Sequence, residues 1–174
     1  MATPTLVPVE LYLHSPAEYE PDAEYVDGEI ELRPMGEYDH ATWQQAIERW
    51  FLGHLKDWNI RVRVELRVRV SATRYRVPDV VVFDRGQPIE QILTRPPIAV
   101  FEVLSPEDRM SRMMVKLGDY EAMGIRTIRV VDPATQAIFR YENGRLENVV
   151  VVTEELADGP CSIDWEQVRT LLDA

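Results

Sequence analysis

Ile98–Val131 reads IAVFEVLSPEDRMSRMMVKLGDYEAMGIRTIRVV, and the fold prediction depends on this stretch. Its two ends, 98–104 and 127–131, are short apolar runs of the kind that form strands buried on both faces. Between them, apolar residues recur at helical spacing and predict a helix from near Asp108 to Gly124: Met110, Met113, Met114, Leu117 and Tyr120. A strand, a helix and a strand in this order predict a crossover connection with parallel pairing.

On the N-terminal side the sequence predicts a helix capped by Asp39, with one apolar stripe: Trp43, Ala46, Ile47, Trp50, Phe51 and Leu55. Over 61–70 every even position is apolar and every odd position is charged, which predicts one half-buried strand. The run 77–83 predicts a strand buried on both faces. Further upstream, Asp27-Gly28 predicts a tight turn into a strand over 29–35.

The remaining segments complete one predicted domain over 1–174, with a Pro-rich, irregular N-terminal arm at 1–23. Asn143-Gly144 predicts a hairpin between strands at 137–141 and 146–152. Asp164 caps a last short helix, so residues 137–174 form a C-terminal hairpin and helix. The predicted class is α/β or α+β, with a central mixed sheet flanked by helices.

Composition limits the function classes. A net charge of −11 argues against a general nucleic-acid coat, although it is compatible with an enzyme that has a local basic groove, and it also serves solubility. The single cysteine excludes an intramolecular disulfide and a multi-cysteine metal site. No apolar run is long enough to span a membrane, and the N-terminus lacks the pattern of a secretory signal, so we expect a cytoplasmic protein without membrane contact.

Two carboxylates stand out because they interrupt apolar strands: Asp79 and Glu102. An unpaired buried carboxylate is costly, so each needs a cation or several hydrogen-bond donors. If the two strands are neighbours, one divalent cation with oxygen ligands satisfies both side chains. The alternative is that each carboxylate pairs privately with an arginine.

Lys116 follows on the second predicted helix, on the same side as Arg109 and Arg112 and next to the apolar stripe. From that position it can reach a phosphate or a metal-bound water at the strand ends. The alternative is an ordinary solvated helix face.

Together these segments resemble the Uma2 family of endonucleases (DUF820), within the PD-(D/E)xK nuclease superfamily. The resemblance covers about residues 20–135 and is carried by Tyr25–Glu29, His40, Arg76–Val80, Phe101–Pro106, Lys116, Tyr120, Gly124 and Val131–Pro133. It implies a restriction-endonuclease-like core and a catalytic set of Asp79, Glu102 and Lys116, in which the two acids bind Mg²⁺ or Mn²⁺. The superfamily's usual lysine position is here Leu104, and Lys116 matches the helix lysine that replaces it in this family. Arg112 stands where many members carry an aspartate.

Further side chains are accessory candidates: His40, Glu29, Arg109 and Arg112. His40 lies on the apolar helix stripe, where it is either a core histidine or a residue beside the active site, and Glu29 is a possible additional acid. Arginines also alternate along the predicted strand at positions 61, 63, 67 and 69. They either track a DNA backbone, face the acidic residues of the chain, or protect a sheet edge.

Three functions compete at this point. The first is a Mg²⁺-dependent endonuclease acting on DNA, for which a homodimer is plausible because a double-strand cut needs two active sites. The second is an inactive relative that uses the nuclease fold for binding or assembly. The third is a metal-dependent hydrolase of a substrate smaller than DNA. The presence of Asp79, Glu102 and Lys116 favours the first function. The negative net charge, and Arg112 in place of the family's aspartate, favour the second.

Overall fold

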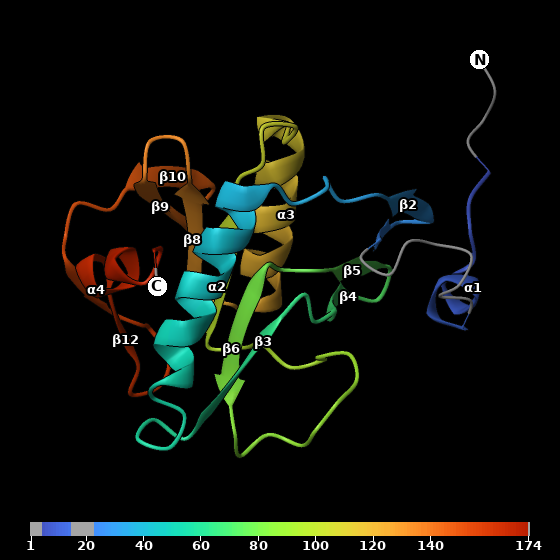
Figure 1. Ribbon diagram of the computed structural model, residues 1–174. Helices are drawn as coiled ribbons and strands as arrows, with labels where there is room; N and C mark the ends of the chain where they lie inside the picture. The colour runs from blue at the N-terminus through green and yellow to red at the C-terminus, as the bar shows by residue number, and fades with distance from the viewer. Residues whose placement is uncertain (1–4, 15–22, 174) are drawn as a thin grey trace.

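The computed structural model describes residues 5–14 and 23–173 and is built on a six-stranded mixed sheet (Figure 1). Its strand order is β10-β9-β8-β7-β6-β3. The strands are β3 (Ile60–Val64), β6 (Val80–Asp84), β7 (Ala99–Val103), β8 (Thr127–Asp132), β9 (Ala137–Glu142) and β10 (Arg145–Asn148). β7 and β8 pair in parallel, and the other neighbours pair antiparallel. The predicted crossover and the mixed sheet are therefore confirmed.

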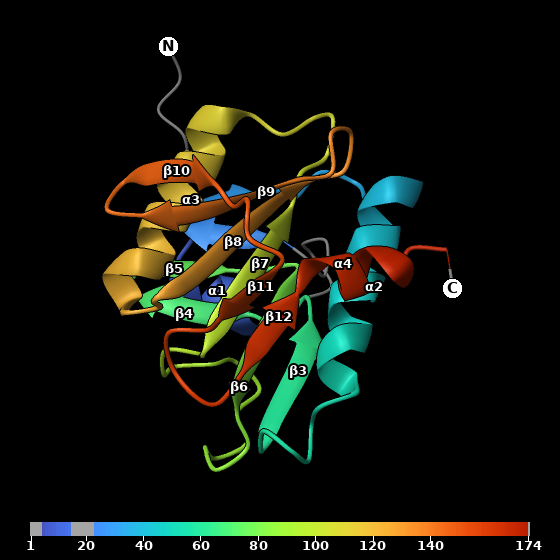
Figure 2. The same cartoon turned by 90° about the vertical axis from the view of Figure 1, so that its left-hand side faces the viewer.

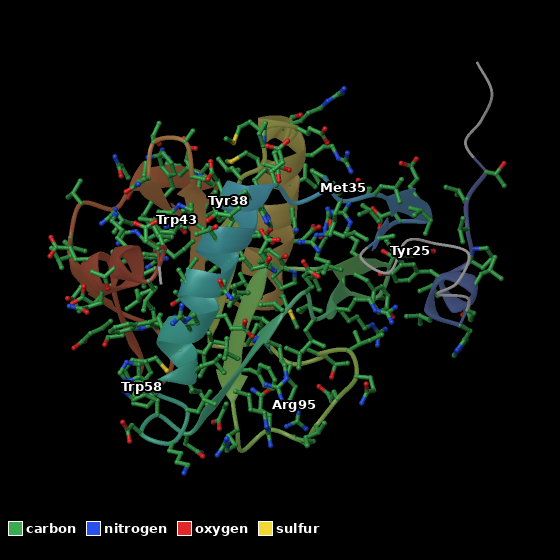
Figure 3. All side chains as sticks on the ribbon, viewed as in Figure 1. Tyr25, Met35, Tyr38, Trp43, Trp58 and Arg95 are labelled. Carbon is green, nitrogen blue, oxygen red and sulfur yellow. The ribbon has the colours of Figure 1, made fainter. Side chains whose placement is uncertain are left out.

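The two long helices, α2 (Tyr38–Leu52) and α3 (Met110–Met123), lie on opposite faces of this sheet (Figure 2). α2 buries its apolar stripe, including Trp43 (labelled in Figure 3), against one face together with α4 (Trp165–Thr170). α3 buries Leu117 and Tyr120 against the other face. Because side chains alternate along a strand, β7 sends Phe101 to the first core and Val100 to the second.

A second, four-stranded sheet has the order β2-β1-β5-β4. It consists of β1 (Glu24–Val26), β2 (Glu29–Glu31), β4 (Val68–Ser71) and β5 (Arg74–Arg76), and the short helix α1 (Val9–His14) packs on it. The packing is aromatic: the ring of Tyr12 stacks on that of Tyr25 with centroids 5.2 Å apart and contacts Tyr75. The predicted N-terminal arm therefore contains a helix, while its residues 1–4 and 15–22 lie outside the described part.

The predicted single strand over 61–70 is wrong. Glu65 adopts a positive φ of 53°, and the chain leaves the six-stranded sheet there and enters the four-stranded sheet at β4. The arginines of this segment consequently do not share one face: Arg61 and Arg63 belong to β3, Arg69 belongs to β4, and the Arg67 guanidinium lies 5.5 Å from the centre of the Tyr12 ring. β3 is a sheet edge, where charged side chains discourage pairing with another chain, whereas Leu93 bridges to the outer side of β4.

Several element ends differ from the predictions. Helix α2 begins at Tyr38 after Glu37, so Asp39 lies in its first turn and is not the cap. Helix α3 begins at Met110, because the Asp108 carboxylate accepts a hydrogen bond from the Ser105 amide (2.6 Å) and shapes the loop before the helix. The strand after Asp27-Gly28 ends at Glu31, four residues early.

The turn signals were correct. Asn143 and Gly144 both have positive φ, 51° and 73°, between the paired strands β9 and β10. The Asp164 side chain caps α4 by accepting a hydrogen bond from the Gln167 amide at 3.0 Å.

The C-terminal region contains a third sheet that was not predicted, formed by β11 (Thr153–Glu155) and β12 (Ser162–Asp164). A buried ion pair anchors it: Arg129 of β8 contacts Glu154 of β11 at 2.9 Å, and the Trp165 indole donates to the same carboxylate at 2.8 Å. None of the helices within 5–14 and 23–173 is both long and apolar enough to cross a membrane.

Two glycines of one helix give opposite predictions. Gly124 ends α3 at φ 102°, a conformation that costs an L-residue about 1–2 kcal/mol. Gly118 lies inside the same helix, where alanine is favoured by about 1 kcal/mol, and an added Cβ there meets the Tyr141 hydroxyl at an ordinary 3.4 Å. We expect Gly124→Ala to lower the free energy of unfolding by about 1–2 kcal/mol.

Gly118→Ala is the matched control and should leave that free energy unchanged or raise it. Urea denaturation followed by circular dichroism measures both variants. Equal destabilisation by the two substitutions would contradict this account of the helix end.

Candidate functional site

Asp79 and Glu102 meet where β6 and β7 run side by side. Asp79 directly precedes β6, and Glu102 lies within β7. The antiparallel register pairs Val80 with Phe101, and one further step along both strands places Asp79 opposite Glu102. Each carboxylate residue is only 2% exposed, and both line one pocket.

The Asp79 carboxylate is held by three donors. The Arg33 guanidinium donates to Oδ1, the Val103 amide donates to Oδ2 at 2.7 Å, and His40 Nε2 lies 3.3 Å from Oδ2. Burial opposes ionisation of Asp79, but the contact with His40 and the charge of Arg33 outweigh it and lower the pKa of Asp79 to about 2. Asp79 is therefore a carboxylate at neutral pH.

Glu102 has different partners, both from α3. Lys116 Nζ donates to Oε2 at 3.0 Å, and the Tyr120 hydroxyl donates to Oε1 at 2.7 Å. These donors are four residues apart on α3 and so face the same strand. Burial raises the pKa of Glu102 to about 7, against the lowering effect of the Lys116 ammonium.

Lys116 is 8% exposed, so the solvated-face interpretation is wrong. Its Nζ contacts the carboxylates of Glu102 (2.9 Å) and Glu24 (2.8 Å) and donates to the Val77 carbonyl at 3.0 Å. Burial disfavours the ammonium, yet the charges of Glu102 and Glu24 hold the pKa of Lys116 above its ordinary value. The ammonium is thus fixed among carboxylates at the ends of the strands.

A second cation, Arg76, lies behind this set and is 1% exposed. Its Nη1 contacts Glu24 and Glu31, each at 2.9 Å, and its Nε donates to Asp119 at 2.7 Å. Glu24 therefore links Arg76 to Lys116, and it also accepts a hydrogen bond from the Val77 amide (2.8 Å). This network fixes the segment that leads into Asp79.

The accessory candidates differ in position. His40 is buried and touches Asp79, so it is both a core histidine and a residue of the site. Arg109 and Arg112 are exposed and line the mouth of the pocket, where Arg112 Nη2 lies 3.4 Å from Glu31. Glu29 is exposed and does not line the pocket, whereas Glu31, two residues further along β2, does.

Sequence reasoning did not single out five residues of the site and of the network behind it: Glu24, Glu31, Arg33, Arg76 and Asp119. Two of them had a signal, because Arg76 directly precedes the apolar run that contains Asp79, and Asp119 follows Lys116 by one helical turn. Glu24, Glu31 and Arg33 had none, since they lie on short segments whose position is set only by packing.

The donor chemistry of the pocket fits a divalent cation. Four of the residues that line it carry carboxylates (Glu24, Glu31, Asp79 and Glu102), and Mg²⁺ prefers oxygen ligands of this type. Within the described residues no three acidic, histidine or cysteine side chains are grouped as a ready-made metal site. In proteins Mg²⁺ is usually held by one or two carboxylates, waters and substrate phosphates.

Comparisons with known proteins give a family and a fold. A family model described as "Uma2: Putative restriction endonuclease" matches residues 9–166. The chain resembles a crystal structure from Anabaena variabilis ATCC 29413, described as "a putative nuclease belonging to DUF820", with a TM-score of 0.72 and 22% identity over 88% of this chain and 93% of that one. This likeness shows a shared fold. No curated protein matches the chain.

A second structure, described as a "DrdV-DNA complex" solved by cryo-EM, matches with a TM-score of 0.42 and 17% identity. The match covers 76% of this chain and 11% of that one, which is too slight to carry an argument.

The network behind the site predicts a stability difference between two arginines of β5. Arg76→Met leaves Glu24 and Asp119 buried without their guanidinium, and losing one partner of a buried ion pair costs about 3–5 kcal/mol. Arg74 contacts Asp27 and Asp119 but is 31% exposed, so Arg74→Met should cost about 1 kcal/mol or less. Chemical denaturation of the two variants measures the difference, and equal losses would contradict a structural role of the buried network.

Proposed function

The chain belongs to the Uma2 family, and we propose that it is a divalent-cation-dependent endonuclease that hydrolyses phosphodiester bonds in DNA. One observation carries the proposal: two buried carboxylates from adjacent strands, Asp79 and Glu102, line one pocket with the Lys116 ammonium. Phosphoryl transfer needs cations beside the reacting phosphate and a positioned water. The pocket contains the groups for both.

Asp79 and Glu102 are the residues that would hold Mg²⁺ or Mn²⁺. Such a cation lowers the pKa of a bound water and stabilises the extra charge on phosphorus. Asp79 suits this role because it stays ionised, and Glu102 suits it because Tyr120 and Lys116 fix the position of its carboxylate.

The chain's own cation has a separate task. Lys116 is held in place by Glu102, Glu24 and the Val77 carbonyl, so its ammonium is preorganised and needs no reorganisation when negative charge develops. From this position Lys116 neutralises a phosphate oxygen or orients the attacking water. His40 positions Asp79 through its contact with Oδ2.

DNA as substrate is supported by the exposed arginines at the mouth of the pocket, Arg109 and Arg112, which offer donors to a phosphate backbone. Because the net charge of −11 repels a phosphate backbone, favourable contacts with DNA are expected only at such a local basic patch.

The competing function is a binding or assembly role without catalysis. The observation that favours it is that both oxygens of Asp79 already have donors from the protein, so a cation must compete for them. The same experiment separates the two functions.

The test is nicking of supercoiled plasmid with Mg²⁺ or Mn²⁺, with and without EDTA. We expect cleavage that needs the cation, and we expect Asp79→Asn, Glu102→Gln and Lys116→Met each to slow it by at least about 100-fold, because each removes charge from the site of reaction. Linear product formed directly from supercoiled plasmid would indicate two active sites acting together.

Asp158→Asn is the matched control, since Asp158 is half-exposed and pairs with Arg126 outside the pocket. It should cleave as fast as the unmodified protein. Equal cleavage by all variants would mean that a contaminating nuclease is responsible. If the unmodified protein does not cleave, and the substitutions in the pocket leave its binding to DNA unchanged, the binding role is favoured.

A further inference from the structure

Arg33 holds an unusual position among the cations of the pocket. It lies in the segment between β2 and α2, outside any helix or strand, and its side chain is 12% exposed. The guanidinium donates to Asp79 Oδ1, and its Nη1 lies 3.9 Å from Glu65. It therefore occupies one of the oxygens that the proposed function assigns to a cation.

The two oxygens of Asp79 are not equivalent. Oδ2 accepts the Val103 amide, which belongs to the backbone of β7, and faces His40. Oδ1 has Arg33 as its donor. Since the backbone amide cannot leave without disturbing the sheet, Oδ1 is the oxygen that another cation can take.

Arg33 also has fewer partners than the two buried cations of the site, Arg76 and Lys116. Arg76 contacts three carboxylates, and Lys116 contacts two carboxylates and a carbonyl. Arg33 has one close carboxylate partner, and Met35, on the same segment and labelled in Figure 3, is 86% exposed. Exchange of partner is therefore easiest for Arg33.

We infer that Arg33 is the resident counter-ion of Asp79, and that it exchanges this carboxylate for a phosphate of the substrate when a divalent cation binds. The inference rests on the proposed function, and it assigns a specific role to a residue outside the catalytic set. Guanidinium suits both partners, because its planar fork matches carboxylate and phosphate alike.

The formal charges of the pocket favour this exchange. Six carboxyl side chains and five lysine or arginine side chains line it, so acidic groups outnumber the permanent cations by one. A divalent cation adds two positive charges to this pocket, and a phosphodiester anion offsets one of them. Cation and substrate phosphate should therefore bind cooperatively, with Arg33 changing partner between the two states.

The first test measures Mn²⁺ binding without DNA, by electron paramagnetic resonance of the free ion. Arg33→Gln removes the competing charge and should bind Mn²⁺ at least about tenfold more tightly than the unmodified protein, about 1.4 kcal/mol. Arg33→Lys, with a shorter reach and no fork, should fall between the two. Arg126→Gln, which removes an exposed arginine paired with Asp158 outside the pocket, should not change the affinity.

The second test measures binding of a short fluorescein-labelled DNA duplex by anisotropy, with Ca²⁺ as the cation. Here Arg33→Gln should bind about tenfold more weakly, the loss expected for one charge-assisted contact of about 1.4 kcal/mol. Tighter cation binding combined with weaker DNA binding is the signature of the exchange, and a purely structural role of Arg33 does not produce opposite changes.

The outcomes separate the inference from the function on which it rests. If Asp79→Asn loses Mn²⁺ binding while the folded Arg33 variants bind Mn²⁺ like the unmodified protein, the inference is overturned and the nuclease site remains. If Asp79→Asn binds Mn²⁺ unchanged, the cation site itself is wrong. Thermal unfolding identifies the folded variants. If Arg33→Gln does not fold, Arg33→Lys, which keeps a positive charge beside Asp79, tests the inference in its place.

Discussion

The burial of carboxylates in one pocket is the constraint on which the site depends. Glu24, Asp79 and Glu102 are each at most 4% exposed, and charges of one sign cannot share a dry pocket unless cations neutralise them. The neutralising cations are Arg33, Arg76 and Lys116. They reach the pocket from three different parts of the chain: the β2–α2 segment, β5 and α3. The ion network therefore joins the six-stranded sheet, the four-stranded sheet and α3, and it fixes the positions of the candidate catalytic side chains.

The sequence predicted the central sheet because its signals are local. The apolar runs at 98–104 and 127–131 with a helical stripe between them specify a crossover, and Asn143-Gly144 specifies a hairpin, without reference to distant residues. The strand over 61–70 failed for the opposite reason. Its alternation continues through Glu65, and only the positive φ of Glu65, imposed by the two sheets on either side, divides it.

The residues of the candidate site likewise differ in whether a local sequence signal reveals them. The sequence singled out Asp79 and Glu102 as candidates because a carboxylate inside an apolar strand needs an explanation wherever it occurs. Lys116 needed the family resemblance, since a helix lysine next to an apolar stripe is ordinarily solvated. Arg33 could not be found, because its contact with Asp79 spans 46 residues and depends on how the β2–α2 segment packs. Partners of buried charges are set by tertiary structure, so local patterns do not reveal them.

The central claim is that Asp79 and Glu102 share one divalent cation. Anomalous diffraction at the manganese edge, from crystals grown with Mn²⁺ and a short DNA duplex, tests it most directly. The account predicts a peak about 2.0–2.6 Å from an oxygen of each carboxylate, with Arg33 released from Asp79. A pocket without a manganese peak, or a peak bound to neither carboxylate, would contradict it.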